Sequence, residues 1–263
     1  ASDSVPNLST AQIQALTGAQ ITALGGNGLS GLSSDQIGAL STAAINTLSG
    51  AQINALGTGT IGSLSTSQLR ALSSSAINTL SSAQVAQLDT KIATLTSSQI
   101  GALSTTVVRE LSSAQIQALG TAGIAALRTN QIQALDTEDV TNLTFAQIGG
   151  LSTSQIAALT ASQIVGLETA DMGALSSGQI RALGTSALSA LSSSQIRTLS
   201  STQLQALTSS QIQALGTGGI NQLSTAQIST LSSANLSGLT TTQIENLSTT
   251  LIESFLRTII SPS

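Results

Sequence analysis

Leucine recurs at every eighth position along most of the chain. The series runs from Leu8 to Leu88 and resumes, after a one-residue deletion, from Leu95 to Leu247. A second apolar residue, usually isoleucine, stands three positions before each leucine, and the consensus octad is Ser-Ser/Thr-x-Gln-Ile-x-Ala-Leu. The pattern predicts an octapeptide-repeat tract over residues 8–247, between an N-terminal extension (1–7) and a distinct C-terminal segment (248–263).

A period of eight excludes a single continuous helix. Eight residues advance an α-helix by about 800°, so the apolar stripe would rotate by about 80° per octad and no fixed face could be buried. Coiled coils need periods of seven or eleven. The backbone must therefore change direction within each octad, and stacked octads then make a solenoid with a shared core.

Capping signals favour a short helix in each octad, hence an all-α solenoid. Ser-x-x-Gln has the spacing of a capping box, in which the serine oxygen and the glutamine side chain each bind a free backbone N–H at the helix start. Charged residues follow the helix dipole, with acids near helix starts and bases near helix ends. The spacing is found in Ser9–Gln12, Ser33–Gln36 and Ser112–Gln115; the acids are Asp35, Asp89, Asp136, Glu138, Asp139, Glu168 and Asp171, and the bases are Arg70, Arg109, Arg181 and Arg197.

Glutamine at the fourth position of the octad predicts the size of the coil. From Gln20 to Gln147 it occurs in every second octad, and glycine, alanine or another residue replaces it in between. We therefore expect two unlike octads, or 16 residues, per coil and about 15 coils. A flat two-sided β-solenoid is the alternative, since isoleucine, threonine and serine suit strands. The usual Leu-Ser turn, without the glycine or asparagine that sharp corners favour, makes helices the preferred interpretation.

The C-terminal segment is more apolar than the array. It is either a cap over the last coil or a docking surface for the first coil of another subunit. Such a head-to-tail contact does not close on itself and would produce a filament. The candidate residues are Leu251, Ile252, Phe255, Leu256, Ile259 and Ile260.

Composition leaves little room for catalysis or nucleic-acid binding. The chain lacks histidine and cysteine, only 7% of residues are charged, and the net charge is −4 without a basic run. Its serines therefore have no base to activate them, and the sequence has no basic run that could bind a phosphate backbone. We predict no enzyme activity, cofactor or metal site. Asp136, Glu138 and Asp139 could form a weak cation site, although helix-start charges are the preferred interpretation. Lys91, in the shortened octad, marks either a kink or a neutral deletion.

The runs Leu8–Leu16 and Leu151–Leu159 resemble octad-repeat tracts of large secreted or surface proteins of Gram-negative bacteria. The resemblance covers about residues 8–247 and implies export to the cell surface or the extracellular space; it assigns no functional residue. Absence of cysteine and a start at Ala1, without an initiator methionine, agree with an exported and processed chain. Apolar residues never run together for 18 positions, so no transmembrane segment is predicted.

These observations predict a structural protein that self-associates head to tail into a fibre or surface appendage. The alternative is a monomeric adhesin or spacer, in which stacked glutamine rows present a repetitive polar face to a surface or a glycan. If instead the glutamines only cap their own helices, that face has no special role. An ice-binding rod is a less favoured third possibility.

Overall fold

The computed structural model describes residues 7–260, and for residues 258–260 it describes the backbone only. It contains many short helices and no strand within those residues, so the all-α prediction is confirmed and the β-solenoid is wrong. The chain divides into two compact units, Ala1–Leu135 and Asp136–Ser263. The predicted tract 8–247 therefore extends over both, and each unit is described separately.

The first unit contains α1–α14 and the 3₁₀ helix η2. Their bounds are α1 (Thr10–Gln14), α2 (Gly18–Ser30), α3 (Ser34–Ala39), α4 (Thr42–Asn46), α5 (Gly50–Ala55), α6 (Thr58–Ser63), α7 (Thr66–Ala71), α8 (Ser74–Ile77), α9 (Ser82–Ala86), η2 (Asp89–Thr94), α10 (Ser97–Ala102), α11 (Thr105–Arg109), α12 (Ser113–Ala118), α13 (Gly120–Ala126) and α14 (Thr129–Ala134).

The second unit contains α15–α29. Their bounds are α15 (Thr137–Thr141), α16 (Phe145–Gly149), α17 (Thr153–Ala158), α18 (Ala161–Gly166), α19 (Thr169–Ala174), α20 (Ser177–Ala182), α21 (Thr185–Ser189), α22 (Ser193–Thr198), α23 (Ser201–Ala206), α24 (Ser209–Ala214), α25 (Gly216–Ile220), α26 (Thr225–Ser229), α27 (Ser233–Leu236), α28 (Thr241–Glu245) and α29 (Thr249–Ile260).

Most octads fold as one capped helix followed by a turn at the leucine, as α7 shows. The Gln68 N–H donates to the Ser65 hydroxyl over 3.3 Å, and the Ser65 N–H donates to Gln68 Oε1 over 3.0 Å. At the other end Leu72 has φ −61° and ψ 135°, an extended conformation that ends the helix and redirects the chain. The capping boxes predicted at Ser9–Gln12, Ser33–Gln36 and Ser112–Gln115 are all present.

A cap without its glutamine partner offers a test of these local signals. In α4 the Ser41 hydroxyl accepts the Ala44 N–H over 3.2 Å, and alanine occupies the glutamine position. We expect Ser41→Ala to lower the free energy of unfolding by about 1 kcal/mol, the usual contribution of an N-cap. The matched change Thr42→Ala, one residue later on an exposed position, should cost less than about 0.5 kcal/mol. Urea unfolding followed by circular dichroism measures both, and equal losses would contradict the capping role.

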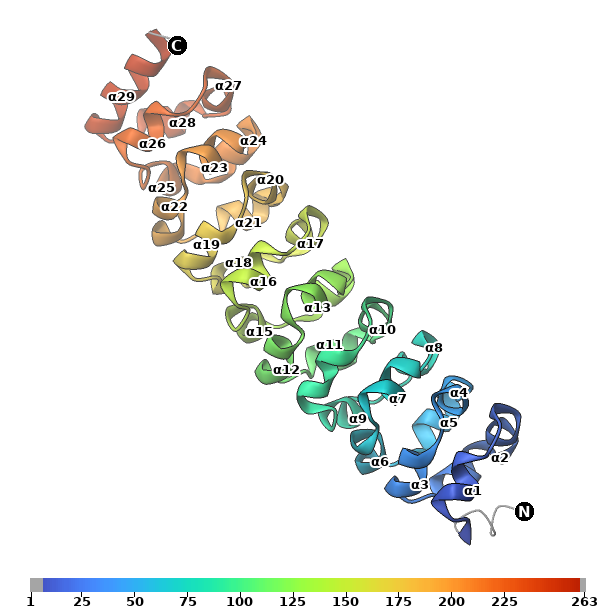
Figure 1. Ribbon diagram of the computed structural model, residues 1–263. Coiled ribbons are helices and arrows are strands. Elements are labelled where there is room, and N and C mark those ends of the chain that lie inside the picture. The colour runs from blue at the N-terminus through green and yellow to red at the C-terminus, as the bar shows by residue number, and fades with distance from the viewer. Residues whose placement is uncertain (1–6, 261–263) are drawn as a thin grey trace. The chain divides into compact units, whose positions relative to one another are not determined.

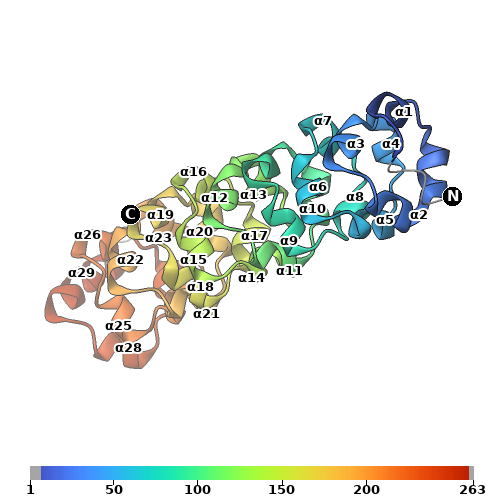
Figure 2. The same ribbon diagram turned by 90° about the horizontal axis from the view of Figure 1, so that it is seen from below.

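Helices pack on the helix three octads further along the chain, rather than on the helix two octads further along. Within the first unit α3 packs on α6 and α4 on α7; within the second, α17 packs on α20 and α20 on α23. Figures 1 and 2 show these helices side by side inside their own units. Side-chain hydrogen bonds add contacts between octads four apart, such as Gln68 to Ile37. A complete coil therefore takes between three and four octads.

The prediction of two octads and 16 residues per coil is thus wrong, and about 15 coils is too many. The extended leucine turns the chain by less than half a revolution, so two octads cannot complete a coil. The alternation of glutamine has a different cause: bonds between octads four apart join octads of the same parity. Glutamines in every second octad can therefore form a continuous series of hydrogen bonds along the unit.

The core of each unit lies where successive coils meet. Isoleucine at the fifth position and leucine at the eighth are its main components, as in Ile37 and Leu40, which expose 0% and 3% of their surface. Serine and threonine at the first two positions remain at the surface in most octads. The leucine and isoleucine pattern therefore identified the core residues correctly, although the coil they line is larger than predicted.

Candidate functional site: glutamine bonds and grooves between coils

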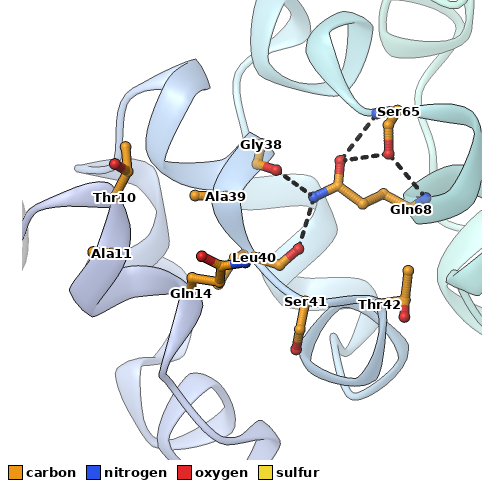
Figure 3. Close-up of a pocket in the computed structure, with 10 residues that line it drawn as sticks. All are labelled: Thr10, Ala11, Gln14, Gly38, Ala39, Leu40, Ser41, Thr42, Ser65 and Gln68. Carbon is orange, nitrogen blue, oxygen red and sulfur yellow. Dashed lines mark hydrogen bonds between the residues drawn. The ribbon is translucent and has the colours of Figure 1, made fainter.

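Buried glutamines connect each coil to the one before it. In Gln68 the Oε1 atom accepts the N-cap N–H, while the Nε2 atom donates to the carbonyls of Gly38 and Leu40 over 3.0 and 2.9 Å (Figure 3). One side chain thus closes the cap of its own helix and binds the end of the helix four octads earlier. We call this set the glutamine ladder: Gln36, Gln52, Gln68, Gln84, Gln99, Gln115 and Gln131 in the first unit, and Gln179, Gln195, Gln203, Gln211, Gln227 and Gln243 in the second.

Burial of the ladder corrects both predicted roles of the glutamine rows. These side chains expose between 1% (Gln131) and 9% (Gln227) of their surface, so they cannot present amides to a ligand. Local capping alone does not describe their role either, because the Nε2 atom of each amide donates to a carbonyl of an earlier coil. Buried carbonyls without a donor are costly, and the ladder removes that cost at each junction it joins.

Asn235 and Lys91 replace glutamine at two ladder positions. The Asn235 Nδ2 atom donates to the Leu207 carbonyl over 2.6 Å, and its Oδ1 accepts the Ser232 N–H. In the shortened octad the Lys91 Nζ atom donates to the carbonyl of Gly62 over 2.6 Å. That octad begins at Asp89, with φ 47°, and folds as η2. The deletion is therefore accommodated locally, and an ammonium group preserves the bond between coils.

Removing that ammonium should weaken the junction. We expect Lys91→Met, which keeps the length and apolar stem of the side chain, to lower the free energy of unfolding by about 1–3 kcal/mol. Lys91→Gln supplies an amide of shorter reach and should recover part of the loss. Thermal and urea unfolding measure both variants. Unchanged stability of Lys91→Met would show that the hydrogen bond to Gly62 contributes nothing.

Two carboxylates occupy ladder positions in the second unit. Asp139 forms a reciprocal capping box with Asp136, and Asp171 accepts the Glu168 N–H over 3.0 Å. Burial raises the pKa of Asp139 to about 6; a backbone hydrogen bond from Asp136 lowers it, and the charges of Asp136 and Glu138 raise it. Burial likewise raises the pKa of Asp171. These acids therefore cap their helices, which is the interpretation that the sequence favours. In the part of the chain that the structure describes, no group of three or more acidic, histidine or cysteine side chains is suited to a metal.

Shallow grooves of one type occur in both units. A groove of about 410 Å³ lies between α1, α3, α4 and α7 and is lined in part by Gly38, Leu40, Ser41 and Gln68 (Figure 3). A groove of about 450 Å³ in the second unit is lined by residues at the same octad positions, among them Gly173, Leu175, Ser176 and Gln203. Hydroxyl, amide and carbonyl groups line both beside apolar atoms, so these grooves can form hydrogen bonds but contain no nucleophile with an adjacent base.

The C-terminal segment covers a coil of its own unit. Its helix α29 packs on α26, where Leu251 and Phe255 are buried to 3% and 7% exposure, and Ile252 is half-buried. Leu256 remains 47% exposed. The side chains of Ile259 and Ile260 lie outside the described residues. Leu251 and Phe255 are therefore buried within their own unit, whereas Leu256 is exposed.

No helix between residues 7 and 260 has the length and apolar character needed to cross a membrane. The model of the ALTTAQ repeat family matches the chain in seven segments that together cover more than half of it. No curated protein matches. The matched segments are residues 29–66, 61–90, 92–129, 108–137, 132–167, 164–199 and 188–217.

Proposed function

The chain belongs to the ALTTAQ repeat family, and from this premise we propose that it is a non-enzymatic structural protein of the bacterial surface or extracellular space, assembling end to end into a fibre or appendage. The observation that carries the proposal is the glutamine ladder. Each coil offers amide donors toward the preceding coil and carbonyl acceptors toward the following one, so the same interface can be repeated without limit.

Surface chemistry supports a structural role. Serine and threonine cover the outside, and the chain has only seven basic and eleven acidic residues. A neutral hydroxyl surface has little electrostatic sensitivity to salt, which suits a protein exposed to changing surroundings. The lack of cysteine and the resemblance to exported octad tracts support an extracellular location.

Electron microscopy and sedimentation of the purified chain test the assembly. Fibres of uniform width that lengthen with protein concentration are the expected result. A chain that stays monomeric at every concentration, in near-neutral buffer and physiological salt, would contradict the proposal.

The recurring grooves favour a second candidate function, a spacer or adhesin module that binds a polar polymer such as a glycan. Equivalent residues line a groove in each unit, as Gly38 and Gly173 do, so a ligand with repeating hydroxyls could bind more than once. Binding to immobilised polysaccharides, compared between the chain and a Gly173→Leu variant that fills one groove, tests this candidate. Equal retention of both proteins would contradict it.

A further inference from the structure

Two surfaces of the described chain have the chemistry of a coil interface but no coil packed on them. The first belongs to α1 and α2. Here Gln12 and Gln20 use Oε1 to accept the N–H groups of Ser9 and Thr17, both over 2.8 Å, exactly as the ladder glutamines cap their helices. Their side chains are exposed, and no acceptor for their Nε2 atoms lies among residues 7–260.

Leucines beside these two amides are also incompletely covered. Leu16 and Leu24 are half-buried, although the equivalent Leu40 and Leu56 are each only 3% exposed. Gln12, Gln20, Leu16 and Leu24 together form what we call the donor surface. It combines amide donors that have no acceptor among residues 7–260 with apolar side chains whose equivalents in other coils are buried.

The second surface lies on α27, α28 and α29. Ile244 stands at the isoleucine position of its octad but is 37% exposed, Leu239 is half-buried, and Leu256 is 47% exposed. By the geometry of the ladder, the carbonyls of Leu239 and Leu247 are those that a glutamine four octads later would bind. Among the described residues no side chain donates to either carbonyl. These four residues define the acceptor surface.

Resting on the proposed function, we propose that the donor surface of one copy docks on the acceptor surface of a second copy. The register follows the interior ladder: Gln12 binds the Leu239 carbonyl and Gln20 the Leu247 carbonyl, while Leu16 and Leu24 cover Ile244 and Leu256. The occupant is a second copy because this chain has both halves of the interface, and its own coils already join by the same bonds, as Gln211 does to Leu183 over 2.8 Å.

The contact is heterologous, since the two surfaces are different. Each copy keeps one free surface after docking, so association continues to a chain of copies unless the rotation closes a ring. Hydrogen bonds give the contact its register, and the half-exposed leucine and isoleucine side chains contribute the apolar area.

Two variants block one surface each. Gln20→Glu keeps an oxygen for the Thr17 cap but removes the amide donor and places a carboxylate against a carbonyl. Ile244→Glu puts a charge on the acceptor surface. The matched control is Gln14→Glu, which makes the same charge change in α1 on a side chain that lines the groove toward α3 instead (Figure 3). Circular dichroism verifies that every variant is folded.

Sedimentation velocity over a concentration series measures association. We expect the unaltered chain and Gln14→Glu to form species larger than dimers. Gln20→Glu and Ile244→Glu should each associate at least tenfold more weakly. An equimolar mixture of these two should form dimers and nothing larger, because each contributes one intact surface.

Failure of this interface and failure of the proposed function are distinguishable. If the unaltered chain assembles and both blocked variants assemble equally well, the interface is wrong, although end-to-end assembly stands. If the mixture of blocked variants forms long species, the two surfaces do not pair. If the unaltered chain stays monomeric, both the interface and the proposed assembly are wrong.

Discussion

Replacement of Gln99 by leucine is expected to lower the free energy of unfolding by about 3–5 kcal/mol, from three buried groups that each lose a partner. The Thr96 N–H loses its acceptor, and the carbonyls of Leu69 and Leu72 lose a donor that lies 2.8 Å from each. Leucine is similar in size and more apolar, so lost packing cannot explain the effect. Gln99 is only 2% exposed, and water cannot readily replace the amide.

Gln12→Leu is the matched control, because Gln12 stands at the same octad position but is exposed and makes only its own cap. Its loss should be about 1 kcal/mol. Urea unfolding gives the total change, and native-state hydrogen exchange locates it, since neighbouring coils carry the coupling in a solenoid. Faster exchange should appear at α7 as well as at α10. Equal losses in both variants would mean that the ladder contributes no more than local capping.

The second large effect is a gain of stability on acidification and on replacement of the ladder carboxylates. Asp139 has a pKa of about 6 in the folded chain, well above the usual 3.8 of an aspartate. A raised pKa means that the folded state binds the proton more tightly. Its contribution is fully present below about pH 4 and is lost as the pH rises through 6, so stability should fall by about 2–3 kcal/mol over that window.

Asparagine at these positions should remove the pH dependence. We expect Asp139→Asn and Asp171→Asn to stabilise the protein at pH 7 and to flatten the stability profile between pH 4 and 7. Asn235 shows that asparagine at the ladder position both caps its helix and donates to the coil four octads earlier. Asp35→Asn, at an exposed first-turn position, is the control and should leave the profile unchanged. A profile that is equally steep in the Asp139→Asn variant would contradict the assignment.

The sequence alone identified the helix, its cap and its core, because each depends on residues within one octad. Ser65 and Gln68 signal a helix start, and Leu72 ends it, wherever the neighbouring coils lie. Coil size depends instead on the angle at each leucine turn, which is a property of the backbone and has no direct signature in residue type. The even spacing of glutamines consequently predicts two octads per coil, although bonds across four octads produce the same spacing.

One signal for the ladder was present in the sequence. A capping box accepts glutamate as readily as glutamine, yet no octad of the array has glutamate at the fourth position. An amide can accept one hydrogen bond and donate another, whereas a carboxylate only accepts. The predominance of glutamine at this position, where Asp139 and Asp171 are the carboxylates, therefore indicates a donor. Lys91 at the same position supports that conclusion, since an ammonium group also donates. The division at Leu135 has no comparable signal, because the octad pattern continues through it.

All ladder bonds point backward along the chain, from a later octad to an earlier one. A polypeptide that emerges amino-terminus first, from a ribosome or through an export channel, therefore presents each new amide to carbonyls that are already in position. Growth of the folded part can then proceed octad by octad behind the exit site, without waiting for residues still to come. Emergence in the opposite direction would leave every carbonyl acceptor to be formed after its donor.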